Sequence, residues 1–102
     1  MALPVLSAEE RTAALEKAAA ARRERKAALE ELTSGKLTLA DVLAGEDPRF
    51  HRVKVHRVLT ALPSVGKATA DKALSVAGVA EGRRVQGLGD RQRKALGLYF
   101  AA

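Results

Sequence analysis

The segment LPSVGKATA, residues 62–70, places a proline, a glycine and a lysine within five residues, between two stretches that favour helix. Pro63 disfavours helical geometry in the residue before it, so we expect it to end the preceding helix. Gly66 permits a tight turn and the close approach of another molecule. The next helix begins with backbone N–H groups that have no partner inside the helix, at the positive end of its dipole. The segment therefore predicts an anion-binding turn between two helices.

The charge around this turn supports a functional role. Lys67 lies in the first helical turn, where a cation is disfavoured unless an anion binds nearby. Residues 1–48 carry 7 basic and 9 acidic side chains, a net of −2, whereas residues 49–102 carry 11 basic and 3 acidic ones, a net of +8. An isolated PxxGK motif also fits a plain turn with a surface lysine. In a strongly basic half-chain it indicates a phosphate clamp of the helix-two-turn-helix kind for a polyanion, most often nucleic acid.

The rest of the 102 residues predicts an all-α protein with one long helix and several short ones. Ser7 followed by Glu10 has the form of a capping box, and neither glycine nor proline interrupts residues 8–32. Alanines are the only apolar residues from 18 to 28, so we expect this helix to project from the core and to end near Gly35. Residues 1–35 are expected to form the long-helix region, and residues 36–102 a small globular domain.

Apolar spacing predicts short helices in the second region, over residues 39–45, 48–62, 67–77 and 91–100. The residues expected to start or end these helices are Thr38, Pro48, Pro63, Gly78 and Asp90. The last helix is expected to bury Leu96, Tyr99 and Phe100. No strand alternation of useful length appears.

A second basic segment, RRVQGLGDRQRK, covers residues 83–94 and has five basic residues in twelve. Two glycines flank Leu88, so the backbone can lie close to a ligand. The combination indicates a track for a phosphodiester backbone, or an arginine inserted into a minor groove. The alternative is a mobile surface loop, in which Leu88 packs against the core as an anchor.

The long helix carries a third basic run, RRERK at residues 22–26. Two interpretations stay open from the sequence. The run either binds phosphate as a secondary site, or forms a solvated face paired with nearby glutamates such as Glu24 and Glu30.

Catalytic and metal-binding sets are not evident. His51 and His56 lie five residues apart, off the spacing that places two ligands on one helix face, and basic residues surround them, so we expect surface histidines. The sequence has no cysteine, no paired carboxylates, no plausible serine nucleophile and no P-loop. We therefore expect no catalytic residue, metal, cofactor or small-molecule substrate. A signal peptide and a membrane span are also not expected, and the lack of cysteine fits a reducing cytoplasm.

Four segments together carry a family resemblance: MALP at the start, AALEKAAAARRER in the long helix, LPSVGKATA at the turn and GLGDRQRKAL near the end. In this order and spacing the chain resembles the actinobacterial (mycobacterial-type) integration host factor over nearly its full length, although residues 34–54 match poorly. The resemblance implies an S13-like helix-two-turn-helix fold. It also implies binding to double-stranded DNA with bending or compaction, and a role in chromosome organisation and phage integration in the nucleoid. We expect a monomer in solution.

Carried onto this chain, the resemblance places DNA contacts at Pro63, Ser64, Gly66 and Lys67 in the turn, and at Arg83 and Arg84. Together with the second basic segment, the expected DNA-binding residues are Pro63, Ser64, Val65, Gly66, Lys67, Arg83, Arg84, Gln86, Gly87, Gly89, Arg91 and Arg93. A secondary set is Arg22, Arg23, Lys26, Arg52 and Arg57. The family often has a basic residue where this chain has Ser64, and usually an arginine where it has Gln86. Each position loses a charge here, for which Arg52 and Arg57 can compensate.

Two other functions fit the same turn. An RNA-binding or ribosome-associated protein is one, because relatives with this turn recognise phosphates in rRNA, and competition between duplex DNA and structured RNA separates the two. A DNA-repair glycosylase is the other. Such enzymes need an N-terminal nucleophile and usually a zinc finger, so the start Met1-Ala2-Leu3 and the absence of cysteine argue against it.

Overall fold

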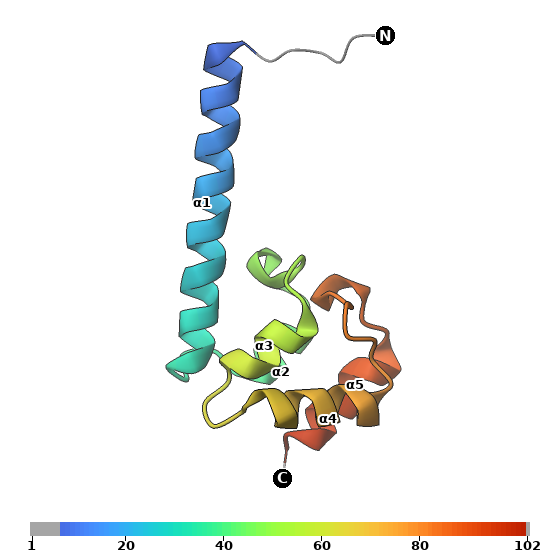
Figure 1. The fold of residues 1–102 in the computed structure, drawn as a ribbon. Coiled ribbons are helices and arrows are strands. Elements are labelled where there is room, and N and C mark those ends of the chain that lie inside the picture. The colour runs from blue at the N-terminus through green and yellow to red at the C-terminus, as the bar shows by residue number, and fades with distance from the viewer. Residues whose placement is uncertain (1–6, 102) are drawn as a thin grey trace, which may run out of the picture.

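One long helix dominates the outline of the molecule, which measures 53 × 33 × 24 Å. The computed structural model describes residues 7–101, in which α1 (Ala8–Thr33) extends well beyond the other helices (Figure 1). Ser7 caps it, because its hydroxyl accepts a 3.1 Å hydrogen bond from the N–H of Glu10. The reciprocal bond of a full capping box is not formed among the described residues. Gly35, with φ +83°, follows the end of the helix as predicted.

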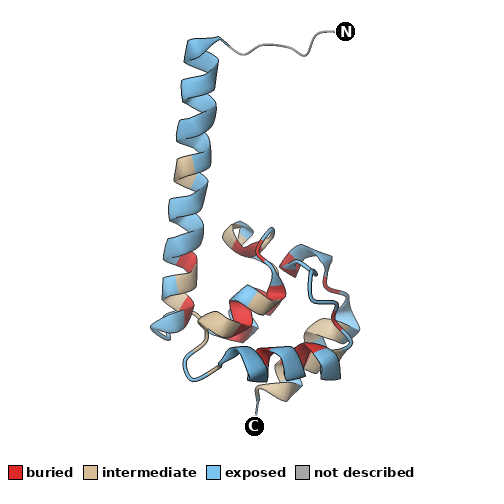
Figure 2. Ribbon diagram, viewed as in Figure 1, coloured by how far each residue is buried: buried red, intermediate tan, exposed pale blue. Residues whose placement is uncertain are grey.

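Only the last turns of α1 reach the core. Ala28 and Leu32 are fully buried, whereas almost all of the helix before them is exposed (Figure 2). The prediction of a projecting helix is therefore confirmed. Two polar links hold its buried end. The hydroxyl of Thr33 donates to the carbonyl oxygen of Ala61 at 2.7 Å, and Glu31 pairs with Arg49.

Short helices form the rest of the fold and confirm the all-α prediction. They are α2 (Leu39–Leu43), the 3₁₀ turn η1 (Pro48–Phe50), α3 (Val55–Ala61), α4 (Lys67–Ala77), the 3₁₀ turn η2 (Val85–Gly87) and α5 (Asp90–Tyr99). Pro48 starts only a three-residue turn, and the α-helix begins later than predicted because Lys54 is extended and forms an isolated antiparallel bridge with Arg84. None of the helices in the described residues is long and apolar enough to cross a bilayer.

A single hydrophobic cluster draws on all of these elements. Its largest fully buried side chains include Phe50, Leu32, Leu59 and Leu96, from η1, α1, α3 and α5. Leu88 is also buried, which confirms its role as an anchor for the glycine-rich loop. Leu96 is buried as expected, but Tyr99 and Phe100 are only half-buried and meet edge to face, with ring centroids 5.1 Å apart.

Local capping explains most helix ends. Thr38 forms a capping box with Asp41 at the start of α2, and these hydrogen bonds to the Thr38 backbone and side chain hold the pKa of Asp41 below its usual value. Gly78, with φ +70°, ends α4 as predicted. The prediction of Asp90 as an N-cap is wrong. Gly89 occupies that position, and the side-chain oxygen of Gln92 accepts its N–H at 3.0 Å.

Candidate nucleic-acid interface

The turn between α3 and α4 has the predicted position but not the predicted backbone. α3 ends at Ala61, and Leu62 is extended before Pro63, as Pro63 requires. We expected Gly66 to supply the tight turn, but its φ is −91°. Ser64 instead carries the positive φ, +65°, in the left-handed region where short polar residues are tolerated. Gly66 is therefore needed for something other than its backbone angle.

The start of α4 is open to an incoming anion. No side chain caps it at Gly66, and the N–H groups of Lys67, Ala68 and Thr69 donate no hydrogen bond within the described residues. A Cβ added at Gly66 would meet no atom within 4 Å, and Lys67 is exposed beside it. Free donors, helix dipole, lysine and bare backbone thus face the same solvent region.

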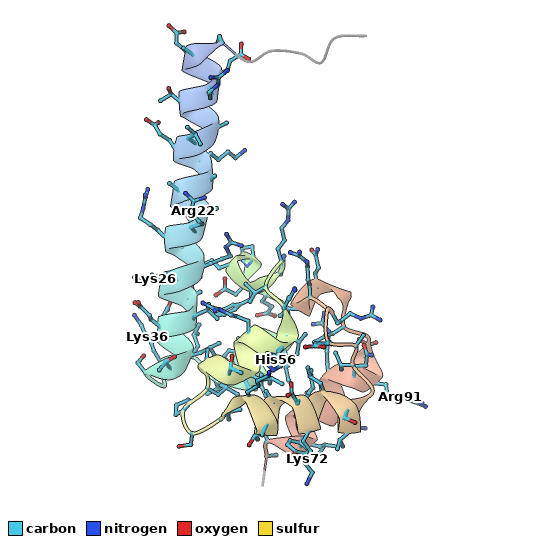
Figure 3. The ribbon with its side chains drawn as sticks, in the orientation of Figure 1. Arg22, Lys26, Lys36, His56, Lys72 and Arg91 are labelled. Atoms are coloured by element: carbon cyan, nitrogen blue, oxygen red, sulfur yellow. The ribbon has the colours of Figure 1, made fainter. Side chains whose placement is uncertain are left out.

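The second basic segment is fastened to the chain before α3. The N–H of Val55 donates to the carbonyl of Arg83 at 2.9 Å, and the N–H of Val85 donates to Val53 at 3.0 Å. Arg84 also donates from Nη1 to the carbonyl oxygen of Arg52 at 2.7 Å. The members of the segment left exposed are Arg83, Arg84, Gln86, Gly87, Gly89 and Arg91. Figure 3 shows Arg91 pointing away from the body of the molecule.

Arg93 does not share this exposure. Its side chain turns inward and donates from Nη1 to the carbonyl of Leu43 at 2.7 Å and from Nε to that of Leu88 at 3.3 Å. Its guanidinium leaves no room for a side chain on Gly45, where a Cβ would lie 2.7 Å from Nη1. We therefore assign Arg93 to the packing of α5 and leave it out of the candidate interface.

The turn and the second basic segment lie at opposite ends of α4. This helix has 11 residues, about 16 Å of axial length. α3 runs between the two regions, from Lys54 beside Arg84 to Ala61 beside the turn. Two separate basic surfaces about 16 Å apart can contact phosphates on different parts of one duplex.

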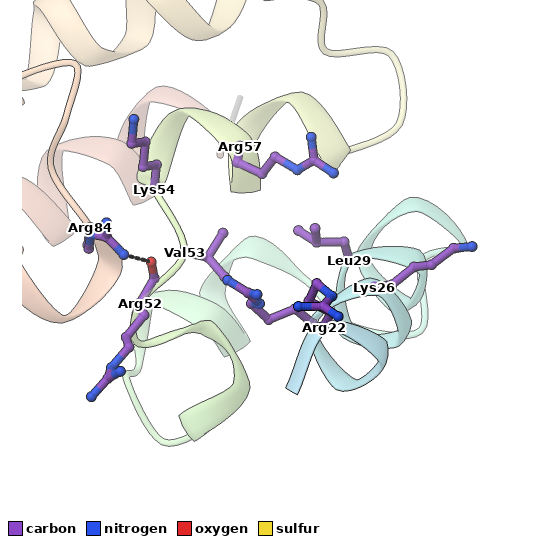
Figure 4. Close-up of a pocket in the computed structure, with 9 residues that line it drawn as sticks. Arg22, Lys26, Leu29, Arg52, Val53, Lys54, Arg57 and Arg84 are labelled. Carbon is purple, nitrogen blue, oxygen red and sulfur yellow. Dashed lines mark hydrogen bonds between the residues drawn. The ribbon is translucent and has the colours of Figure 1, made fainter. Parts of the chain in front are cut away.

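A hollow of about 490 Å³ between α1 and the segment before α3 gathers most of the secondary set (Figure 4). We name it the α1–α3 groove. It is lined by Arg22, Arg25, Lys26, Leu29, Arg52, Val53, Lys54, Arg57 and Arg84. Of the secondary set, only Arg23 is missing from this lining.

Sequence reasoning missed two basic residues of the groove, Arg25 and Lys54. Residues 22, 25, 26 and 29 share one helix face at intervals of three and four, so helical spacing would have selected Arg25 over Arg23. The alternative of a face paired with glutamates is wrong. Neither Glu24 nor Glu30 forms an ion pair within residues 7–101.

The two histidines are structural rather than fully exposed, which corrects the expectation of surface histidines. Nε2 of His51 lies 3.0 Å from the carbonyl oxygen of Gly45, and Nε2 of His56 lies 2.9 Å from a carboxylate oxygen of Asp71. Both rings are half-buried. Across the part of the chain described, no three His, Cys, Asp or Glu residues come together in a way that could hold a metal ion.

Known proteins match this chain over most of its length. The S13-like H2TH domain family matches residues 32–100. Integration host factor of Mycobacterium tuberculosis is 50% identical over 98 residues, which cover 94% of this chain and 93% of that protein. The chain belongs to the integration host factor family. The Streptomyces coelicolor integration host factor is 42% identical over 104 residues, covering 100% of this chain and 97% of that protein.

A solved member of the integration host factor family has the same fold. It is described as sIHF bound to an 8 bp palindromic DNA and superposes with a TM-score of 0.77 at 39% identity. The match covers 83% of this chain and 98% of that chain. The resemblance inferred from the four sequence segments is thereby confirmed, together with the S13-like helix-two-turn-helix fold.

Proposed function

We propose that this protein is a nucleoid-associated protein that binds double-stranded DNA largely through phosphate contacts. It bends or compacts the DNA and supports chromosome organisation and phage integration. The relatives named integration host factor and the DNA-bound structure of the same fold support this function. The observation that carries it is the open start of α4, where free N–H groups, bare backbone at Gly66 and the Lys67 ammonium converge.

Each part of the turn has a distinct role in the proposal. Backbone N–H groups at the start of α4 donate to one phosphate, and Lys67 adds a full positive charge. Pro63 and Ser64 shape the turn, while Val65 holds it to the core, against which it packs half-buried. Gly66 leaves room for the sugar-phosphate backbone.

The exposed arginines of the second segment make the second contact. Arg83 and Arg84 stand beside the chain before α3, and Arg91 lies at the start of α5. Arginine suits a minor groove or a phosphate because its planar guanidinium donates several hydrogen bonds. This region offers little to read base edges from a recognition helix, so binding is largely independent of sequence.

Binding to RNA is the competing function, and the DNA-bound relative does not favour it. A titration of a random 20 bp duplex against a structured RNA of equal charge, at two salt concentrations, decides between them. We expect the duplex to bind more tightly at both. Lys67→Ala should weaken duplex binding, whereas Lys36→Ala, an exposed lysine after α1, should not. Preference for RNA, or equal effects of both substitutions, would overturn the proposal. Light scattering on the free protein tests the expected monomer.

A further inference from the structure

We propose that the α1–α3 groove binds a free oligophosphate, a short chain of directly linked phosphate groups such as tripolyphosphate. This site goes beyond the proposed duplex binding at the turn and the second basic segment. The groove has the volume of a small-ligand pocket, about 490 Å³. Its ligand is identified by the charge and chemistry of the residues that line it.

Seven of the nine lining residues are cations and none is a carboxylate. They approach from two walls. Arg22, Arg25 and Lys26 come from α1, and the others come from the segment before α3, from α3 itself and from the Arg84 loop (Figure 4). None of the seven forms an ion pair among the described residues, while Glu24 and Glu30 line neighbouring hollows. Converging unpaired charges repel one another, so an anion between them is stabilising.

The groove holds its shape without a ligand. Arg84 is fixed by its 2.7 Å hydrogen bond to the carbonyl oxygen of Arg52, and Arg52 and Lys54 flank the buried Val53. On the other wall, the buried Ala28 and the Glu31–Arg49 ion pair hold the end of α1 against the core. The walls therefore need little ordering on binding, which favours affinity.

The lining selects phosphates over bases or sugars. The apolar members are Leu29 and Val53, and no aromatic or amide side chain lines the groove to stack on a base or read its edge. The remaining groups are guanidinium and ammonium donors, which suit phosphate oxygens.

Charge density favours linked phosphates over a nucleic-acid strand. The three cations on α1 span about 6 Å of helix axis, given a rise of about 1.5 Å per residue. One strand of a duplex presents only about two phosphates over that length. Seven cations exceed that number, whereas an oligophosphate concentrates more negative charge in the same space.

Calorimetry with sodium tripolyphosphate on the full chain tests this site. We expect one tripolyphosphate per chain, with orthophosphate at least about tenfold weaker. The double variant Arg22→Gln/Arg25→Gln should weaken tripolyphosphate binding at least about tenfold. The matched control is Arg11→Gln/Lys17→Gln, which removes the same charge from exposed positions of the same helix and should change binding less than about twofold. Glutamine preserves helix propensity, and circular dichroism checks the fold of both variants.

Three results would overturn the assignment: equal losses in the groove variant and its control, orthophosphate binding as tightly as tripolyphosphate, or a groove variant that loses more affinity for a random duplex than for tripolyphosphate. The last result would make the groove part of the duplex surface. Failure of the duplex proposal itself is read separately from Lys67→Ala, which lies outside the groove.

Discussion

Nη1 of Arg93 donates a 2.7 Å hydrogen bond to the carbonyl oxygen of Leu43 and so fastens α5 to the end of α2. That carbonyl lies at the C-terminal end of a helix, where a cation is favourable. The bond joins residues 50 positions apart, and the guanidinium fills the space that the absent side chain of Gly45 leaves. Arg93 is therefore part of the packing that sets the position of α5.

Replacing Arg93 should lower stability and leave DNA binding unaltered. Arg93→Met removes the donors to Leu43 and Leu88 and should cost about 1–3 kcal/mol. In a domain of this size that corresponds to a fall in Tm of about 4–8 °C for each kcal/mol. Thermal unfolding followed by circular dichroism measures it, with the exposed Arg91→Met as control. Equal Tm values for the two variants would show that the inward bonds contribute nothing.

Gly66→Ala should separate binding from stability. An added Cβ meets no protein atom, and the loss of a glycine N-cap roughly offsets the reduced entropy of the unfolded chain, so stability should change by about 0.5 kcal/mol or less. A phosphate backbone seated on α4 would meet the new methyl group, so duplex affinity should fall at least about threefold, about 0.7 kcal/mol. Gly82→Ala, at another open glycine, is the control in the same gel-shift titration. Unchanged affinity of Gly66→Ala would place the DNA elsewhere.

Local signals made much of the fold predictable. The N-cap at Ser7, the stop at Pro63 and the left-handed end at Gly78 each act within a few residues, so the sequence predicts them directly. The start of α5 was harder to assign, because Asp90 fits the usual preference for an N-cap. The side chain of Gln92 supplies the acceptor instead, which leaves the cap position to Gly89.

The candidate site was only partly predictable, because its geometry depends on contacts between distant residues. Helical spacing could have assigned Arg22 and Arg25 to one face of α1. The opposing wall exists only once Arg84 reaches Arg52, 32 residues away. The inward turn of Arg93 has the same origin. No local pattern distinguishes an arginine that contacts solvent from one that bonds a distant carbonyl.

The projecting part of α1 should exchange its amide hydrogens fastest among the helices. Residues 8–27 contribute no fully buried side chain, so tertiary packing does not stabilise their hydrogen bonds. Protection in hydrogen exchange measured by NMR should rise sharply from Ala28, which is the first buried residue of the helix. Uniformly strong protection from residue 18 onward would contradict this expectation.

Acid should release the contact that Arg49 makes with Asp47. Arg49 donates to that carboxylate, with Nη2 at 2.8 Å from Oδ2, and holds the pKa of Asp47 below its usual value. A carboxylate with a lowered folded pKa adds stability above its unfolded pKa of about 3.9, and this stability is lost as pH falls through the folded pKa.

Arg49→Gln should therefore destabilise the protein by about 1 kcal/mol or less at pH 7 and have a smaller effect near pH 2.5. Urea unfolding at both pH values measures the difference. Arg23→Gln removes an exposed arginine without an ion pair and serves as the control. An Arg49→Gln effect that is equally large at both pH values would assign it to packing rather than to charge.

Salt dependence should report how many phosphates the protein contacts. The turn offers backbone donors and Lys67, and the second segment offers exposed arginines, so about four to six phosphates are neutralised on a duplex. The logarithm of the association constant should then fall against the logarithm of salt concentration with a slope of roughly −4 to −5. Changing the DNA sequence should alter affinity much less than changing salt, apart from the share set by bendability.

Single charge removals should change this slope in a countable way. Lys67→Gln and Arg83→Gln should each flatten it by about one unit, because each removes one phosphate contact and the counterion that the contact releases. Lys36→Gln lies after α1, away from both basic surfaces, and should leave the slope unchanged. Fluorescence anisotropy of a labelled duplex at four salt concentrations measures all three variants. A shallow slope combined with strong preference for one sequence would require a base-reading element, and it would exclude phosphate contacts at the turn as the main source of affinity.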